Sequence, residues 1–369
     1  MSEEMTEKKK KWKIGWGYTS MCDMRCPFCY SQSVRREPVE MDFEVAKAFV
    51  DGNAEEIDSI NYGTGECALS ENWYRLVLYI REKYPEIRQA LTTNGSVFRL
   101  VRNNRREAEK LFDAVREMDV SLDFPDAGIH NRNRGRDDAF EGVLGTLELC
   151  RKYGALATIV MVAYEKTLHR ENIDGLFALA ENYHAFLRIN LLRKVEGVNM
   201  DPPGYQQTMD ALRYILDHYA VVSLCDPLFG SVFGVPVQEG DSCGHTSLRI
   251  LPDGSVTPST YLITPEWRSV TLQKDLKLSE IASLPEFRRI TETPVPDTCK
   301  GCPTVNTCCG GAVDRRILTY SSLGQRDPYC PFVHGDTLHQ DQKVRLFTGA
   351  SPSVHDGYLP TMIFSPEGE

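Results

Sequence analysis

The sequence predicts an α/β protein that begins with a partial (βα)6 barrel of the TIM type and continues into a C-terminal cysteine-rich domain. Short β-rich runs alternate with amphipathic helical patterns from about residue 12 to 225, which is typical of parallel strands joined by helices. Cysteines gather in two places, three near the start of the chain and five between residues 299 and 330. We therefore expect two metal-binding regions, one in each domain.

Six runs rich in β-branched and aromatic residues are the predicted strands of the barrel, at residues 11–16, 57–62, 87–92, 118–123, 156–163 and 186–192. Helical spacing of apolar residues between these runs predicts helices with one buried face. One such face consists of Trp73, Leu76, Val77 and Ile80, and another of Phe140, Val143, Leu144 and Leu147. Reactive groups are expected at the carboxyl ends of the strands, where this architecture places active sites.

The chain becomes rich in glycine and proline after residue 225, which predicts a domain boundary at about residues 225–235. We expect a tail over residues 1–11, the barrel over 12–225, the cysteine-rich domain over 226–335 and a loop-like tail over 336–369.

Composition excludes several classes of protein. The net charge of −10 argues against a nucleic-acid partner, and no run of about 18 apolar residues is present to span a membrane. The basic run at residues 8–11 is not followed by an apolar stretch, so we expect no secretory signal and a cytoplasmic location. Twelve cysteines in such a chain favour metal binding over disulfides.

The stretch "TSMCDMRCPFCYSQ" places Cys22, Cys26 and Cys29 in a C-x3-C-x2-C pattern directly after the first strand. Three thiolates can hold three corners of an iron-sulfur cluster and leave the fourth open. The alternative from spacing alone is a zinc knuckle that a distant residue completes.

This pattern, with Phe28 before the last cysteine, resembles the radical S-adenosylmethionine (SAM) superfamily. The resemblance implies a [4Fe-4S] cluster whose open iron binds the amino and carboxylate groups of SAM. It also implies reductive cleavage of SAM to a 5′-deoxyadenosyl radical, which abstracts hydrogen from a substrate carbon.

Three later motifs resemble the cofactor-binding elements of that superfamily. They imply that SAM contacts Thr64, Gly65 and Glu66 after the second strand, Thr93 and Asn94 after the third, and Ser121 and Arg134 after the fourth. In this resemblance Glu66 would bind the methionyl amino group, and Ser121 and Arg134 the carboxylate. Thr64 replaces the usual first glycine, so an altered turn is expected there.

The second cysteine region contains Cys299, Cys302, Cys308 and Cys330, a spacing that by itself suits zinc and iron-sulfur clusters equally. With the upstream "CGHTSLRILPDGSVTPST", it resembles the C-terminal SPASM extension of some radical SAM enzymes. The resemblance implies that these four cysteines hold one auxiliary [4Fe-4S] cluster.

A second auxiliary cluster, nearer the active site in that family, is expected to be absent because Ser259 and Ala312 replace two of its cysteines. Cys243 remains at a family position near the substrate, so we expect its thiol to donate hydrogen to a substrate radical. The alternatives are a buried leftover thiol or a ligand of a rearranged cluster. Cys309 is expected to pack or to be an alternative ligand.

Thr260 stands where sulfatase maturases of the family carry an aspartate base, which disfavours formylglycine formation. The resemblance favours modification of a ribosomally synthesised peptide; the alternative is dehydrogenation or epimerisation of an aminoglycoside, another sugar or a small metabolite. A non-catalytic iron-sulfur or zinc protein is a remote third possibility. We expect a flavodoxin- or ferredoxin-type electron donor. Because no domain precedes the first strand, a peptide would need a separate leader-peptide-binding protein.

Overall fold

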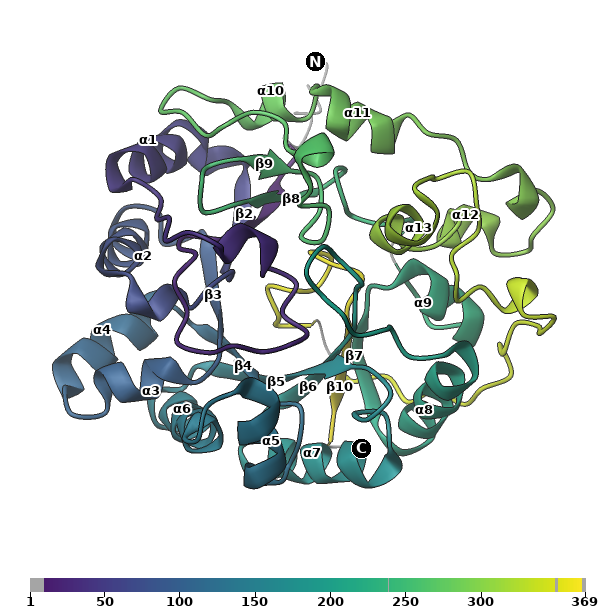
Figure 1. The fold of residues 1–369 in the computed structure, drawn as a ribbon, viewed down its shortest axis with the longest axis horizontal. Helices are drawn as coiled ribbons and strands as arrows, with labels where there is room; N and C mark the ends of the chain where they lie inside the picture. Colours follow the sequence, from purple (N-terminus) through teal and green to yellow (C-terminus); the bar gives the residue numbers. More distant parts are fainter. Residues whose placement is uncertain (1–9, 238, 349–350, 367–369) are drawn as a thin grey trace, which may run out of the picture.

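The computed structural model describes residues 10–237, 239–348 and 351–366, so most of the predicted tail over residues 1–11 lies outside the described residues. The core of the protein is one ten-stranded sheet in the order β7-β10-β6-β5-β4-β3-β2-β1-β8-β9. The sheet curves into an open ring with helices around its outside, which confirms the predicted barrel-like α/β fold (Figure 1). Within the described residues, no helix has both the length and the apolarity needed to cross a bilayer.

All six predicted barrel strands form, and consecutive strands pair in parallel. They are β1 (Trp12–Trp16), β2 (Ile57–Tyr62), β3 (Arg88–Thr93), β4 (Glu117–Ser121), β5 (Leu156–Ala163) and β6 (Phe186–Leu191). Parallel pairing requires a crossover after each strand, and helices supply it. The carboxyl ends of all six strands therefore lie at the same end of the ring.

The crossover helices are α1 (Phe43–Asn53), α2 (Glu71–Lys83), α3 (Ser96–Val101), α4 (Arg105–Ala114), α5 (Ala127–Arg134), α6 (Ala139–Tyr153) and α7 (Arg170–Asn182), with α8 (Tyr205–His218) after β6. Helix α2 begins where the Ser70 hydroxyl accepts a hydrogen bond from the Trp73 amide. The predicted face of Trp73, Leu76, Val77 and Ile80 is buried. In α6 the predicted Val143 and Leu147 are buried together with Cys150, while Phe140 and Leu144 are partly exposed.

The cysteine-rich part of the chain follows β7 (Ala220–Leu224). It contains α9 (Pro227–Phe233), β8 (Ser247–Ile250), β9 (Val256–Thr257), α10 (Leu278–Ile281), α11 (Pro285–Thr291), α12 (Val305–Cys308) and α13 (Val313–Tyr320). Strand β8 pairs in parallel with β1 and extends the barrel sheet. Helices α9 and α13 lie in the gap between edge strands β7 and β9 (Figure 1). Strands on both sides of residue 225 belong to the same sheet, so the sheet does not mark a domain boundary there. The boundary near residues 225–235 stays a prediction.

The final strand, β10 (Met362–Ser365), inserts between β6 and β7 and runs antiparallel to both. The prediction of a loop-like tail over residues 336–369 did not include this strand. All four of its residues are buried, so it lacks the alternation of apolar and polar residues that marks a half-exposed strand. Its pairing partners lie more than 130 residues away along the chain, and local sequence does not report them.

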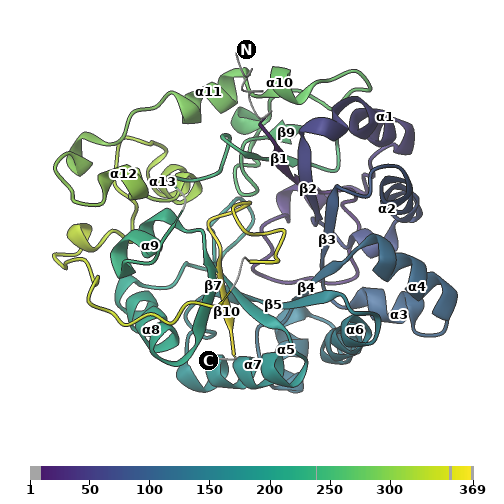
Figure 2. The same cartoon turned by 180° about the vertical axis from the view of Figure 1, so that it is seen from behind.

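The segment before β10 passes through the middle of the ring of strands, as the yellow trace shows in Figures 1 and 2. There the Ser353 hydroxyl and the Val354 amide donate hydrogen bonds to the buried carboxylate of Glu117 on β4. His355 Nδ1 lies 2.8 Å from Asp119 Oδ2, also on β4. The C-terminal segment thus fills the interior of the barrel below the strand ends.

Replacing His355 with alanine is expected to lower the free energy of unfolding by about 3 kcal/mol, because Asp119 is fully buried and would keep only Arg188 and the Thr92 hydroxyl as partners. Urea unfolding of the purified chain measures the effect. His334→Ala is the matched control, since His334 is exposed. A loss no larger than that of the control would show that the barrel does not depend on this contact.

Candidate active site

A cavity opens at the carboxyl ends of the strands, with an empty volume of about 1120 Å³ that is partly open to solvent. It contains most of the residues that the sequence motifs predicted for cluster and cofactor binding. They are Cys22, Cys26, Cys29, Phe28, Thr64, Gly65, Thr93, Asn94, Ser121 and Arg134. Segments from four different strand ends therefore converge on one space.

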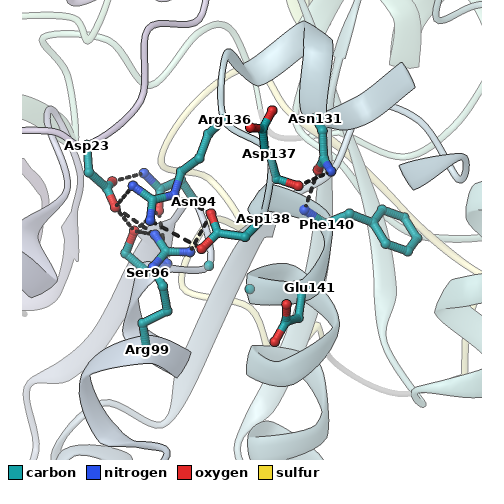
Figure 3. A network of polar contacts seen from close by, with 12 residues as sticks. Asp23, Asn94, Ser96, Arg99, Asn131, Arg136, Asp137, Asp138, Phe140 and Glu141 are labelled. Carbon is teal, nitrogen blue, oxygen red and sulfur yellow. Dashed lines mark hydrogen bonds and ion pairs between the residues drawn. The ribbon is translucent and has the colours of Figure 1, made fainter. Parts of the chain in front are cut away.

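Asp23 anchors the three-cysteine loop to the neighbouring strand ends. Its carboxylate accepts hydrogen bonds from Asn94 (2.9 Å), Ser96 (2.7 Å) and Arg99 (2.6 Å), and Arg136 lies 3.2 Å away (Figure 3). Burial alone would raise the pKa of Asp23, but the hydrogen bonds outweigh it and hold the pKa below its usual range. The carboxylate stays ionised and fixes the loop beside the end of β3.

Each of the three cysteine sulfurs has an N–H group nearby. The pairs are Asn94 Nδ2 with Cys22 (3.6 Å), Arg134 Nη1 with Cys26 (3.9 Å) and Arg35 Nη1 with Cys29 (3.4 Å). Burial raises the pKa of Cys22 to about 12, so a bound metal is needed to hold it as a thiolate. Three convergent thiols with N–H donors around them fit a [4Fe-4S] cluster that has one open corner.

Arg134 is buried between the cluster loop and the strand ends. Its Nε lies 2.8 Å from the fully buried Asp123, and its guanidinium stacks over the ring of Phe28 at 5.0 Å. Phe28 in turn stacks on Tyr164. The cluster loop and the segment after β4 thus pack directly against each other.

The turn after β2 has an unusual backbone. Thr64 has φ of 82° and Gly65 has φ of 64°, both in the left-handed region. A Cβ on Gly65 would lie 2.4 Å from the Met21 carbonyl oxygen, so only glycine fits where this turn meets the cluster loop. Thr64 adopts the strained conformation with its hydroxyl held by Tyr30 and Arg249. Thr64 thus holds a backbone conformation that glycine adopts at lower cost.

Glu66 is placed differently from the other predicted cofactor residues, because it does not line the cavity. Its carboxylate is 1% exposed and accepts hydrogen bonds from the Asn94 amide (2.7 Å) and the Thr93 hydroxyl (2.9 Å). Burial raises its pKa to about 7 despite these hydrogen bonds. Glu66 therefore holds the Thr93–Asn94 loop in place.

This raised pKa predicts a pH dependence of stability. Between pH 4.5 and about 7 the unfolded chain binds fewer protons at Glu66 than the folded chain does, so the free energy of unfolding falls as pH rises. We expect Glu66→Gln to remove about 3 kcal/mol of this fall. Urea unfolding at both pH values measures it, with the exposed Glu86→Gln as control. Equal slopes in wild type and Glu66→Gln would contradict the prediction.

Four cysteines line a second, separate pocket with an empty volume of about 380 Å³: Cys299, Cys302, Cys308 and Cys330. Cys309 is not among its lining residues, and its sulfur donates to the Asn306 carbonyl at 3.4 Å. The chain thus brings together the four thiols predicted for the auxiliary cluster. The position of Cys309 favours the packing role that we expected over the alternative of a ligand.

Cys243 lies outside both pockets and is fully buried in an apolar cluster that includes Leu262 and Trp267. Its side chain contacts those of Ser259 and Asp241, and burial raises the pKa of the thiol well above its usual value. Ala312 is also fully buried. This placement favours the alternative of a buried thiol over the predicted hydrogen donor, and it leaves no thiol set for an inner cluster at these described positions.

Several cavity residues were missed by the sequence motifs. They are Arg188, Asn190, Arg193, Arg249, Tyr261, His355 and Tyr358. A weak signal was present on β6, where Arg188 and Asn190 alternate with apolar residues and therefore face the opposite side of the strand. His355 and Tyr358 had no such signal, because only the pairing of β10 with β6 and β7 brings the segment that carries them to the cavity.

Residues 16–179 match the model of the family described as the Radical SAM superfamily. The chain contains a radical SAM domain. A [4Fe-4S] cluster and SAM are the cofactors of this domain, and the three-cysteine loop with its companion motifs lies in the matched region. The predicted radical SAM domain is confirmed over these residues, and the chain is an enzyme.

The similarity to known proteins extends beyond that domain. Mycofactocin maturase MftC of Mycolicibacterium smegmatis is 26% identical over 349 residues, which cover 90% of this chain and 86% of the relative. The structure of histidine-tagged anSMEcpe with bound AdoMet has a TM-score of 0.67 at 19% identity, covering 86% of this chain and 90% of that one. Streptococcus suis SuiB bound to its precursor peptide SuiA has a TM-score of 0.63 at 13% identity, covering 87% and 76%. The two structures support the fold.

Proposed function

We propose that this protein is a radical SAM enzyme that modifies a ribosomally synthesised peptide. The observation that carries the proposal is the similarity to a mycofactocin maturase over 90% of the chain. The fold that this chain shares with SuiB, whose structure was solved with a bound precursor peptide, supports the proposal. The large cavity above the cluster loop offers space for a substrate side chain beside the cofactor site.

When bound, the cluster and SAM supply a 5′-deoxyadenosyl radical that abstracts hydrogen from carbon. In our proposal Cys22, Cys26 and Cys29 bind three irons, and Arg35, Arg134 and Asn94 donate N–H groups toward their sulfurs. Such donors stabilise thiolate charge.

The remaining residues orient the cofactor. Phe28, Thr64 and Gly65 shape the space beside the open cluster corner, and Thr93 and Asn94 flank it from the end of β3. Ser121 and Arg134 offer donors for the SAM carboxylate. Glu66 acts from below by holding Thr93 and Asn94.

The proposal includes one auxiliary [4Fe-4S] cluster on Cys299, Cys302, Cys308 and Cys330, which line one pocket. It also includes a flavodoxin- or ferredoxin-type electron donor and a separate leader-peptide-binding protein. Because cluster ligands must remain reduced, we place the enzyme in the cytoplasm.

Co-expression with each short peptide encoded beside this gene tests the proposal. We expect one peptide to change mass with the wild-type enzyme and to stay unchanged with Cys26→Ala. Tandem mass spectrometry locates the modified residue. No change in any neighbouring peptide, together with a modified sugar or other small metabolite, would favour the alternative substrate class.

A further inference from the structure

The lining of the active-site cavity is rich in arginine. Among the described residues, this lining contains no aspartate or glutamate. Its five arginines are Arg35, Arg134, Arg188, Arg193 and Arg249. Guanidinium groups remain charged at all physiological pH values. Each of these charges therefore needs a partner that compensates for its removal from water.

Four of the five arginines have such a partner. Three form ion pairs with fully buried aspartates, Arg134 with Asp123 (2.8 Å), Arg188 with Asp119 (3.2 Å) and Arg193 with Asp314 (3.1 Å). Arg35 faces the sulfur of Cys29 at 3.4 Å and is therefore compensated by the thiolate of a bound cluster.

Arg249 on β8 is the exception. It is 2% exposed, and its Nη2 shares its two N–H groups among the Gly63 carbonyl, the Thr64 hydroxyl and the Tyr30 hydroxyl. The guanidinium also hydrogen-bonds the Tyr358 hydroxyl, so all of these partners are neutral. Its Nε has no hydrogen-bond partner, and no carboxylate of the described residues forms an ion pair with it. The guanidinium is thus a buried charge without a counter-ion at the wall of the cavity.

Two glycines provide the room for this charge, Gly15 on β1 and Gly17 directly after that strand. A Cβ on Gly15 would lie 1.5 Å from the Tyr358 hydroxyl and 2.9 Å from Arg249 Nη1. A Cβ on Gly17 would lie 2.8 Å from the Cβ of Thr64, which binds the same guanidinium. Side chains at these two positions would therefore displace Arg249 or its partners. The neighbouring strand is adapted to hold the guanidinium where it is.

We propose that Arg249 binds a carboxylate group of the substrate. A buried guanidinium with an unused donor is matched best by a carboxylate, which supplies both charge and acceptor oxygens. The carboxylate of SAM is the other possible source. It already has a predicted partner in Arg134, which follows β4, whereas Arg249 lies on β8 with β3, β2 and β1 between them. The inference rests on the proposed enzyme function and specifies a chemical group of its substrate.

Two small probes that differ only in the carboxylate test this proposal: N-acetylglycine and N-acetylglycinamide. Their binding to the anaerobically reconstituted full chain with SAM is measured by calorimetry, without reductant and without turnover. We expect wild type to bind the carboxylate at least about tenfold more tightly than the amide, because hydrogen bonds to charged groups are the strong ones. In Arg249→Gln the two probes should bind equally, and Arg249→Lys should keep part of the preference.

Arg132→Gln is the matched control, because it removes the same charge from an exposed position outside this cavity. A carboxylate preference that survives in Arg249→Gln would overturn the proposal. If Arg249→Gln kept the carboxylate preference and lost SAM affinity about tenfold, the guanidinium would bind the cofactor, and this result would also overturn the proposal. Absence of peptide modification would contradict the proposed function while leaving this binding result intact.

Discussion

Replacing Cys26 with alanine is expected to lower reductive cleavage of SAM by more than about 100-fold. Cys26 is one of three thiols at the cavity, and the loop that carries it offers no fourth cysteine to take its place. Without it the cluster loses one of its three protein ligands. The amount of 5′-deoxyadenosine formed by the reconstituted, dithionite-reduced protein measures the effect, and slow cleavage is expected in wild type even without substrate.

Cys309→Ala serves as the control for the loss of a thiol as such, because Cys309 lies outside both cysteine-lined pockets. It should cleave SAM at the wild-type rate. Cleavage that persists in Cys26→Ala would mean that this loop does not hold the reactive cluster.

The second large effect concerns metal content. Two complete ligand sets imply about eight irons per reconstituted chain, and Cys308→Ala should retain about four. Cys308 is buried and lines the second pocket, whereas its neighbour Cys309 points its sulfur at a backbone carbonyl. Cys309→Ala should therefore keep about eight irons. Iron and zinc analysis of both variants measures the difference between two adjacent cysteines.

Three outcomes would contradict this account of the clusters. About twelve irons in wild type would show that an inner cluster exists. A loss of about four irons in Cys243→Ala would make that buried cysteine a ligand. Stoichiometric zinc without iron would exclude both clusters.

Local signals in the sequence were enough to predict the barrel strands and their helices. Each strand was a short β-rich run, and the helix face of Trp73, Leu76, Val77 and Ile80 followed directly from spacing. The cluster loop was predictable for the same reason, since Cys22, Cys26 and Cys29 lie within eight positions. Features that depend only on residues close together in the sequence can be predicted without knowing the fold.

Features that depend on distant pairing were not predictable. Strand β10 consists of four buried residues that gain their hydrogen bonds only from β6 and β7. His355 lines the cavity because that strand fixes the end of the segment before it. Arg249 occupies an ordinary strand position, and its missing counter-ion becomes visible only when every cavity residue is placed.

Two predicted roles depended on the direction of a side chain, which a motif does not specify. Glu66 turns beneath the Thr93–Asn94 loop and away from the cavity. Cys243 packs into an apolar cluster with Trp267. In both cases the packing around the side chain determines what it contacts.

Transfer of deuterium from a peptide to the cofactor tests the central claim most directly. The precursor peptide encoded beside this gene, prepared with deuterated amino acids, is incubated with the reduced enzyme and SAM. If the enzyme abstracts hydrogen from a peptide carbon, the 5′-deoxyadenosine will carry deuterium and the same peptide will be modified. Formation of unlabelled 5′-deoxyadenosine beside an unchanged peptide would contradict the claim.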